Sequence, residues 1–406
     1  MRLLKCVGLL LLLLPLSACG DRLELEQQAY VVVMGLDRAE GNLIRVTFQV
    51  ANPQVGSTDR GSAPNEAPSD IVTFTAPDIL SAKDIANSVI TRRISFAHLQ
   101  TMIIGEKLAR TQLFHHIMAD SIRDPEMRRE MNLMVCREKA ESFIKRNKPE
   151  METRPHKYYS FMQKRWKDTG FVPYSTMNRY FQRVGRELFL AIYATTKRLK
   201  QVEGNEDGYE AGQIPQRSGD PVQMMGSAVF KEGRMVGTMT GEETRYALLL
   251  RRRVLAKSFI MSIQDPLNPR FRVSFRVIRS KSTSVSMDVG GERPIVKVRI
   301  PLKVQVHSVP SLLNYESNEK NQQLLKKSIQ KELQAGAMDI IRRTQTEFQG
   351  EPFIWYTEVR RYFRTLQQYE AYDWEKHYTK ARVHVDFDLD IESFGKQLKS
   401  QQVSGR

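Results

Sequence analysis

Three aspartates, Asp386, Asp388 and Asp390, are the most obvious candidates for chemistry in this sequence of 406 residues. They alternate with apolar residues, so on a β-strand their carboxylates share one face, and a calcium site is one interpretation. Side chains two residues apart on a strand are about 6.6 Å apart, which is long for ligands of one ion. We therefore favour pairing with the basic face of a neighbouring strand. That face carries Lys297, Arg299 and Lys303.

The histidines and the remaining polar clusters are weaker candidates. His115 and His116 are adjacent, so on a helix they point about 100° apart and do not form a chelating pair. Cys136 ends the apolar run 131–136, where a buried small hydrophobe is favoured over a nucleophile. The basic cluster 251–253 is explained equally well as a site for lipid or an acidic partner and as the solvated end of a helix.

The sequence contains none of the common catalytic motifs. Gly-x-Ser-x-Gly, the phosphate loop, Gly-x-Gly-x-x-Gly, Cys-x-x-Cys and His-Glu-x-x-His are all absent. We therefore expect a protein that is not an enzyme and that needs no metal or cofactor. An envelope hydrolase whose site is assembled from distant residues is the least favoured alternative.

The N-terminus predicts covalent lipid attachment at Cys19. A basic start precedes an apolar run over 7–14, which is far shorter than the roughly 20 residues that span a bilayer. Residues 16–19, Leu-Ser-Ala-Cys, resemble the bacterial lipobox at all four positions. The resemblance implies removal of a signal peptide, 1–18, and transfer of a diacylglyceryl group, with palmitate-type chains, to the Cys19 thiol. An ordinary signal peptide and an uncleaved anchor are the alternatives.

The bulk composition is that of a basic folded body. The chain has 62 basic and 46 acidic residues, a net charge of +16, and 41% hydrophobic residues. A basic protein held at a membrane is attracted to anionic headgroups. Nucleic acid is the other usual partner of such charge, but an exported lipoprotein rarely meets it, so no nucleic-acid partner is expected.

The first half of the chain predicts an α/β or α+β unit, because strands and helices alternate. Residues 30–50 predict a β-hairpin that turns at 37–42, and residues 51–70 predict a loop. Residues 123–126, Arg-Asp-Pro-Glu, predict a charge-paired turn in which Pro125 opens a helix. Further strands are expected at 71–75, 101–104, 131–136 and 188–194, and helices at 78–93, 106–121, 137–145 and through most of 147–185.

The second half predicts a sheet covered by a long helix. Residues 226–239 form a second hairpin pattern, followed by a helix at 242–250. Three later segments alternate strictly between apolar and polar residues, which indicates an antiparallel sheet with one buried and one wet face. They are 270–277, 295–307 and 382–391. A helix at 321–348 has an apolar stripe that suits it to cover this sheet.

These elements predict a multi-domain α+β protein. We expect an N-terminal domain over 19–200, a linker or long loop over 201–221 and a C-terminal domain over 222–400. The linker is rich in Gly, Pro and charged residues and poor in apolar ones.

Several segments, taken in order, resemble one family, the Ger(x)C lipoproteins that are the C subunits of spore germinant receptors. The first half contributes Cys19, Asp21, Glu24-Leu25, Gly35-x-Asp37, Phe96 to Leu99, Ile103 to Glu106, Leu108-Ala109, Arg123 to Glu126 and Arg128. The second half contributes Gly226, Ala228 to Lys231, Met235 to Gly237, Gly241 to Thr244, Gln345, Trp374 and the final strand up to Gly395. Two places depart from the family pattern: Gly20 to Arg22 lacks an aromatic residue, and Gly350 to Trp355 replaces an Asp/Gly-rich stretch.

The resemblance implies three mixed α/β domains and a non-enzymatic subunit on the outer face of the spore inner membrane. It implies partnership with two integral membrane subunits, A and B, in sensing nutrients and triggering germination. A solute-binding lipoprotein of a transporter is the alternative, since it shares the anchor and the location. Such proteins usually have two repeated lobes with parallel sheets, which the alternating strands after residue 270 do not favour.

Overall fold

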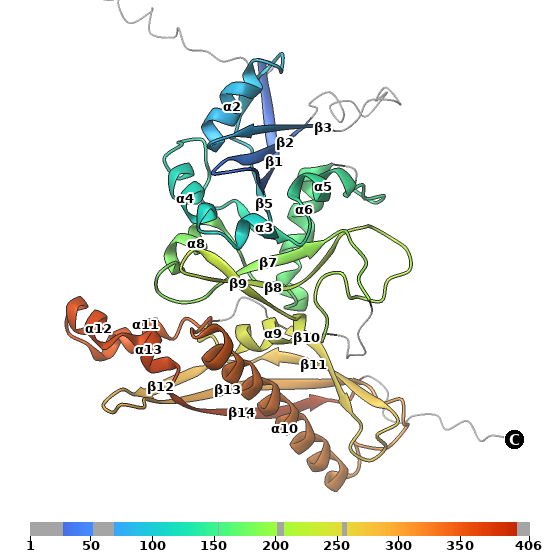
Figure 1. The fold of residues 1–406 in the computed structure, drawn as a ribbon. Helices are drawn as coiled ribbons and strands as arrows, with labels where there is room; N and C mark the ends of the chain where they lie inside the picture. Colours follow the sequence, from blue (N-terminus) through green and yellow to red (C-terminus); the bar gives the residue numbers. More distant parts are fainter. Residues whose placement is uncertain (1–26, 52–68, 153, 201–206, 254–257, 396–406) are drawn as a thin grey trace, which may run out of the picture.

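The computed structural model describes residues 27–51, 69–152, 154–200, 207–253 and 258–395. In these residues, two β-sheets lie one beyond the other along the molecule (Figure 1). The first contains strands between Gln28 and Met239, and the second contains strands between Ser258 and Ser393. The mixed, multi-layered α/β architecture expected from the sequence is confirmed.

The first sheet combines parallel and antiparallel strands. Its strands are β1 (Gln28–Arg38), β2 (Ile44–Ala51), β3 (Ser69–Ala76), β4 (Arg93–Ser95), β5 (Thr101–Gly105), β6 (Asn132–Cys136), β7 (Phe189–Thr195), β8 (Gln223–Lys231) and β9 (Arg234–Met239). The order β3-β2-β1-β5-β6-β7-β8-β9 is antiparallel at both ends and parallel from β1 to β7, with β4 beside the start of β1. The hairpins predicted at 30–50 and 226–239 are confirmed as β1–β2 and β8–β9.

Helices cover both faces of the first sheet. They are α2 (Ile79–Asn87), α3 (Glu106–Ala109), α4 (Gln112–Ser121), α5 (Ala140–Arg146), α6 (Pro155–Lys164), α7 (Trp166–Thr169) and α8 (Met177–Arg183). Apolar residues of α2, α4 and α8 share one core with Met102 and Ile104 of β5, whereas those of α5 and α6 share another with Ile103. Because both faces are buried, the strands are continuous apolar runs rather than alternating ones.

Three local predictions for the first half differ from the structure. The helix expected over 78–93 ends at Asn87, and the one expected over 106–121 is divided between α3 and α4. Pro125 opens no helix, since residues 122–131 form turns. Most of the loop expected at 51–70 lies outside the described residues.

The second sheet is covered on one face by a long helix. Its elements are α9 (Gly241–Leu249), β10 (Ser258–Gln264), β11 (Arg272–Arg279), β12 (Ser284–Asp288), β13 (Ile295–Ser308), α10 (Glu319–Arg343), the π-helix η3 (Thr344–Phe348), α11 (Tyr356–Val359), the 3₁₀-helix η4 (Arg360–Tyr362), α12 (Leu366–Tyr372), α13 (Trp374–Tyr378) and β14 (Arg382–Ser393). Figure 1 shows α10 lying across the strands. Together α10 and η3 match the helix predicted at 321–348, and its apolar stripe is buried as expected.

The prediction of a purely antiparallel second sheet was wrong. Strand β13 pairs antiparallel with β11 and β12 but parallel with β14. The period of two reports that one face is buried and the other wet, and it carries no information on strand direction. The segment from α10 to α13 returns the chain to the start of β13, where Arg382 lies opposite Ile295, so β14 must run in the same direction.

The two sheets share one apolar core. Leu188, Leu190 of β7 and Val229 of β8 pack in the same cluster as the residues between α10 and the second sheet. The hairpin β8–β9 follows the segment 201–221 in the chain. It nevertheless belongs to the first sheet, because β8 pairs with β7. Residues 207–221 contain no helix or strand. The domain limits expected from the sequence, 19–200 and 222–400, stay a prediction.

Candidate functional site

Cys19, the expected lipidation site, lies outside the described residues. The described chain begins at Gln27, which is exposed and directly precedes β1. Among the described residues, no helix is long and apolar enough to span a membrane. Attachment through Cys19 therefore stays a prediction.

Two of the three aspartates of β14, Asp386 and Asp388, pair with the basic face of β13, as the favoured interpretation predicted. Arg299 Nη2 donates to Asp388 Oδ2 at 3.0 Å, and its Nε lies 3.8 Å from Asp386 Oδ2. Lys303 Nζ donates to Glu392 Oε1 at 2.8 Å. All of these side chains are exposed, so the pairs contribute little to stability. In the described part of the chain, no group of three His, Cys, Asp or Glu side chains is placed to hold a metal ion.

The other individual candidates from the sequence analysis have structural roles. His115 is half-buried, and its Nδ1 lies 2.9 Å from the Tyr180 hydroxyl; His116 is exposed. Cys136 is fully buried, and burial raises the pKa of its thiol well above the ordinary value. The thiolate is the reactive form, so Cys136 is a small core residue, as expected.

Asp37 and Gly105, from two motifs that carry the resemblance, form one packing unit. The buried Asp37 carboxylate accepts hydrogen bonds from the backbone N–H groups of Ala140 at 2.7 Å and Glu141 at 3.0 Å. These are the first two residues of α5, whose N–H groups have no partner within the helix. A Cβ at Gly105 would overlap Asp37 Oδ1, so glycine is required beside this carboxylate.

Glu126 connects two further motifs of the first half. Its Oε2 accepts from the Phe96 backbone N–H at 2.7 Å, and its Oε1 lies 3.0 Å from Lys83 Nζ. Asp124 Oδ1 accepts from the Glu126 backbone N–H at 2.8 Å and so fixes the turn. The segment 123–126 is thus a turn that holds the chain before Phe96, rather than the start of a helix.

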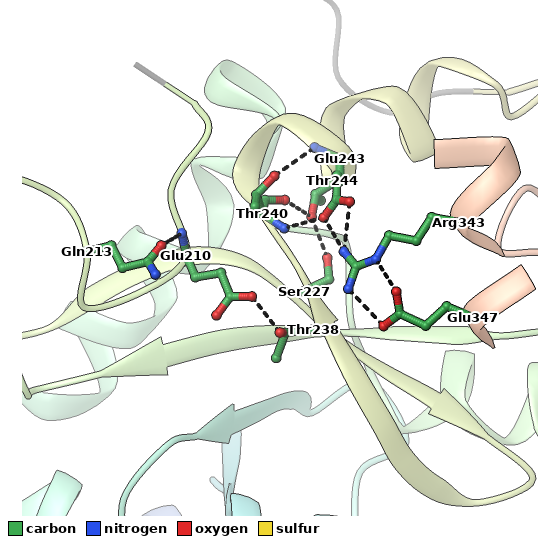
Figure 2. A network of polar contacts seen from close by, with 9 residues as sticks. All are labelled: Glu210, Gln213, Ser227, Thr238, Thr240, Glu243, Thr244, Arg343 and Glu347. Atoms are coloured by element: carbon green, nitrogen blue, oxygen red, sulfur yellow. Dashed lines mark hydrogen bonds and ion pairs between the residues drawn. The ribbon is translucent and has the colours of Figure 1, made fainter. Parts of the chain in front are cut away.

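A network of polar contacts lies at the seam between the two sheets. Arg343, the last residue of α10, donates through Nη1 to both carboxylate oxygens of Glu243 at 2.7 and 2.6 Å (Figure 2). Its Nε and Nη2 donate to the two oxygens of Glu347 at 2.7 and 3.0 Å. Glu243 also accepts from the Thr240 backbone N–H at 2.9 Å in the capping box of α9. One carboxylate therefore caps α9 and binds the end of α10.

The same network continues into the first sheet. Ser227 Oγ of β8 lies 2.8 Å from Thr244 Oγ1 of α9 (Figure 2). Arg245, almost fully buried, donates to Asp207 Oδ2 at 2.7 Å and to the carbonyl of Ile260 in β10 at 2.9 Å. Helix α9 is thus tied by side chains to both sheets.

A second cluster buries four ionisable groups at the seam. They are Arg183 and Glu187, an ion pair with a separation of 3.0 Å, together with Arg251 and Glu351. Burial, with help from Glu187, raises the pKa of Glu351 to about 8. Burial, followed by the charge of Arg183, lowers the pKa of Arg251 to about 9. Removal of one member of such a cluster is costly because the others stay buried without compensation.

This second cluster corrects the expectation for Arg251, which is neither part of a solvated helix end nor part of a binding patch; Arg252 and Arg253 are exposed. Arg251 is buried, and its Nε donates to the Pro352 carbonyl at 3.0 Å. Arg252 is exposed and donates to both oxygens of Glu358 at 2.8 and 2.9 Å. The sequence analysis did not identify Glu187 and Glu351. Charged residues are common along the chain, and no local motif marks either glutamate as buried.

The residues described above therefore act in contacts that hold the fold together. Three bonds connect the segments that carry the two sheets: Thr244 of α9 with Ser227 of β8, Arg245 of α9 with Asp207, and the Ile354 backbone N–H with Glu187, so relative motion of the sheets would break them.

Comparison with known proteins gives matches along both halves of the chain. Residues 21–193 match the family model described as "Spore germination protein N-terminal domain". Residues 225–395 match the model described as "Spore germination B3/ GerAC like, C-terminal".

Similar proteins from Bacillus subtilis (strain 168) carry corresponding names. Spore germination protein B3 is 21% identical over 390 residues, which cover 95% of this chain and 96% of that protein. The putative spore germination protein YfkR is 20% identical over 408 residues, 98% of each chain. Spore germination protein KC is 29% identical over 147 residues, which cover 35% of this chain and 36% of that protein. The crystal structure of the GerBC protein has a similar fold, with a TM-score of 0.52, 16% identity and coverage of 88% of this chain and 96% of that chain.

Proposed function

The chain belongs to the Ger(x)C family of spore germination proteins, and from this premise we propose that it is the lipid-anchored C subunit of a nutrient germinant receptor. The observation that carries the proposal is the ordered match of both halves, 21–193 and 225–395, to spore germination domains. The subunit acts with integral membrane subunits A and B, on the outer face of the spore inner membrane, to trigger germination.

The anchor is Cys19, which carries the lipid after removal of residues 1–18. The lipobox-like Leu-Ser-Ala-Cys at 16–19 supports this assignment. Two acyl chains hold a protein stably at a bilayer, where a single chain gives marginal binding. Tethering also concentrates the body beside membrane partners, which raises its effective concentration without new contacts.

The body works through protein contacts rather than catalysis. Support comes from the residues that the sequence singled out for chemistry: Asp388 is ion-paired, His115 contacts Tyr180, and Cys136 is buried. The alternative of a solute-binding lipoprotein receives less support, because the described residues form two unlike sheets rather than two repeated parallel lobes.

The receptor role is tested by deleting the gene and scoring germination in response to single nutrients. We expect the response to at least one nutrient to be lost and to return on complementation. Normal germination with every nutrient, in a strain without a second copy of the gene, contradicts the proposal.

The anchor and the partners need separate tests. Cys19→Ala should move the protein from the membrane to the soluble fraction and impair germination more than any single change in the body, whereas Cys6→Ala, within the signal peptide, should do neither. A soluble Cys19→Ala protein that supports full germination contradicts a role for the anchor. Affinity purification of spore membranes through a tagged C-terminus should recover the A and B subunits.

A further inference from the structure

The end of the first sheet at which the chain enters it carries an exposed loop, the segment 85–93, which we call the α2 tip. It runs from the last turn of α2 to the first residue of β4. Strand β4 pairs parallel with the start of β1, and Arg93 lies opposite Gln28. The α2 tip therefore lies beside the point where the chain enters β1. Figure 1 shows α2 near the start of β1, at the end of the molecule away from the second sheet.

Two apolar side chains of the α2 tip face solvent. Val89 is 67% exposed, and Ile85 is 41% exposed. They are four residues apart, about one helical turn, so they are neighbours on one side of the tip. Single exposed apolar residues are common on protein surfaces, whereas adjacent ones indicate a surface that binds something.

The fold of the α2 tip does not depend on the Val89 side chain. The Val89 backbone N–H donates to the Ala86 carbonyl at 3.1 Å. Asn87 Oδ1 accepts from the Ile94 backbone N–H at 2.8 Å and so closes the loop onto β4. Ile90 packs against the core of the first sheet. These contacts hold the tip in one shape and leave Val89 outside it.

The apolar pair is followed by two cations that are available to a partner. Arg92 is half-buried and Arg93 is exposed. Within the described residues, neither guanidinium forms an ion pair or a hydrogen bond with another residue. Lys83 of α2, by contrast, is ion-paired at 3.0 Å. Asp84 is the only acidic residue over 79–93, so the tip favours anionic partners.

The proposed anchor brings the α2 tip close to lipid. Cys19 precedes Gln28 by nine residues, which span at most about 30 Å. The start of β1, and the tip beside it, therefore stay within about that distance of the bilayer surface. An apolar pair flanked by arginines suits this surface, because apolar side chains enter the boundary of the acyl chains while guanidinium groups reach the phosphates.

We propose that the α2 tip is a second membrane contact, in which Val89 and Ile85 enter the bilayer interface and Arg92 and Arg93 bind the phosphates of anionic lipids. The contact rests on the proposed anchor, which supplies proximity. It is weak by itself, since even a single acyl chain gives only marginal binding. Its effect is orientation: the first sheet faces the bilayer and the second sheet projects away from it (Figure 1).

The test uses the mature chain, residues 19–406, with Cys19→Ala, so that no lipid is attached. The remaining cysteine, Cys136, is buried, and Val89→Cys therefore adds the one accessible thiol for an environment-sensitive dye such as NBD. With vesicles of equal parts phosphatidylglycerol and phosphatidylcholine, the dye fluorescence should rise about twofold or more and shift to the blue as the tip enters the interface.

Leu80→Cys is the matched control, because Leu80 is 48% exposed but lies in the first turn of α2, on the opposite side from Val89. Its dye should not respond. A silent dye at Val89→Cys overturns the proposal and leaves a protein as the occupant of the tip. An equal response at Leu80→Cys also overturns it, since the protein then meets the vesicle without a preferred side.

Paired variants separate the tip from the general positive charge of the protein. Arg92→Gln with Arg93→Gln should lower the partition coefficient on the anionic vesicles by about tenfold or more, and Ile85→Ser with Val89→Ser by about fivefold or more. Arg270→Gln with Arg293→Gln removes the same charge from exposed sites on the second sheet and should lower it by about twofold at most.

Equal losses for the two arginine pairs, or no loss for the serine pair, contradict a contact at the tip. The serine pair and the Arg270/Arg293 pair change residues that are all exposed, so their unfolding midpoints should match the parent and verify folding. Failure of the anchor is distinguishable, because it appears in the fractionation of the wild-type protein, whereas this assay contains no anchor.

Discussion

Replacing Gly336 with alanine should destabilise the protein, although alanine is the better helix former. Gly336 lies in the middle of α10, where glycine costs about 1 kcal/mol relative to alanine. A Cβ at this position would overlap Cε2 and Cζ of Tyr246 and lie 2.6 Å from its hydroxyl oxygen. Tyr246 is 1% exposed, so its ring has no room to move away.

The expected magnitude follows from the competition between these two effects. Relieving the overlap requires α10 to move away from α9 by about 1 Å, and overpacking of this kind costs about 1–3 kcal/mol. Because the overlap involves several atoms of a buried ring, we take the upper end. After subtraction of the gain of about 1 kcal/mol in helix propensity, Gly336→Ala should lower the free energy of unfolding by about 2 kcal/mol.

Urea unfolding of the full mature protein measures this change. Ala335→Gly, at the exposed neighbouring position, is the matched control and should cost about 1 kcal/mol through propensity alone. In a Tyr246→Ala background the sign should reverse, since the obstacle is gone. A Gly336→Ala protein at least as stable as the wild type would refute the reasoning.

Three further predictions concern the seam and the core. Arg343→Met should lower the free energy of unfolding by about 1.5–3 kcal/mol in urea, because Glu243 and Glu347 both lose a half-buried partner; a loss below about 0.5 kcal/mol contradicts this. An unfolded glutamate titrates near pH 4.3, whereas burial raises the pKa of Glu351 to about 8, so the folded protein retains a proton between these values and its stability should fall by up to about 1.4 kcal/mol per unit as the pH rises from about 4.5 to 8. Glu351→Gln should flatten that dependence, and an unchanged slope counts against it. Cys136 should resist maleimide in the native protein and react after unfolding, as mass spectrometry of its peptide would show.

The local patterns were readable because they depend on neighbouring residues. The apolar–polar alternation over 295–307 follows the pleat of one strand, and the stripe of 321–348 follows the turns of one helix. The charge pairing of β14 was also accessible, since a row of acids facing outward needs a row of bases on the next strand. The lipobox pattern ending at Cys19 is likewise contained in a few consecutive residues.

The family motifs were visible in the sequence, but their purpose was not. Gly35-x-Asp37 and Gly105 are far apart in the chain, and only the parallel pairing of β1 with β5 brings the Asp37 carboxylate against the Gly105 backbone. Likewise, Glu126 holds Phe96 through a hydrogen bond between residues 30 apart in the chain. A motif indicates that a residue type is required, whereas its contact partner depends on the tertiary fold.

The sequence by itself determined the class of elements and the family series, because each is written in short-range spacing; the lipid signal is written in the same way and stays a prediction. The direction of β14, the burial of Arg251 and the position of the α2 tip beside the start of β1 were decided only by the tertiary structure. The bond between Ile354 and Glu187 joins residues 167 apart, and no pattern local to either one predicts it. Burial changes a charged residue from a solvated group into part of a cluster, and burial is a property of the packed chain rather than of its neighbours in sequence.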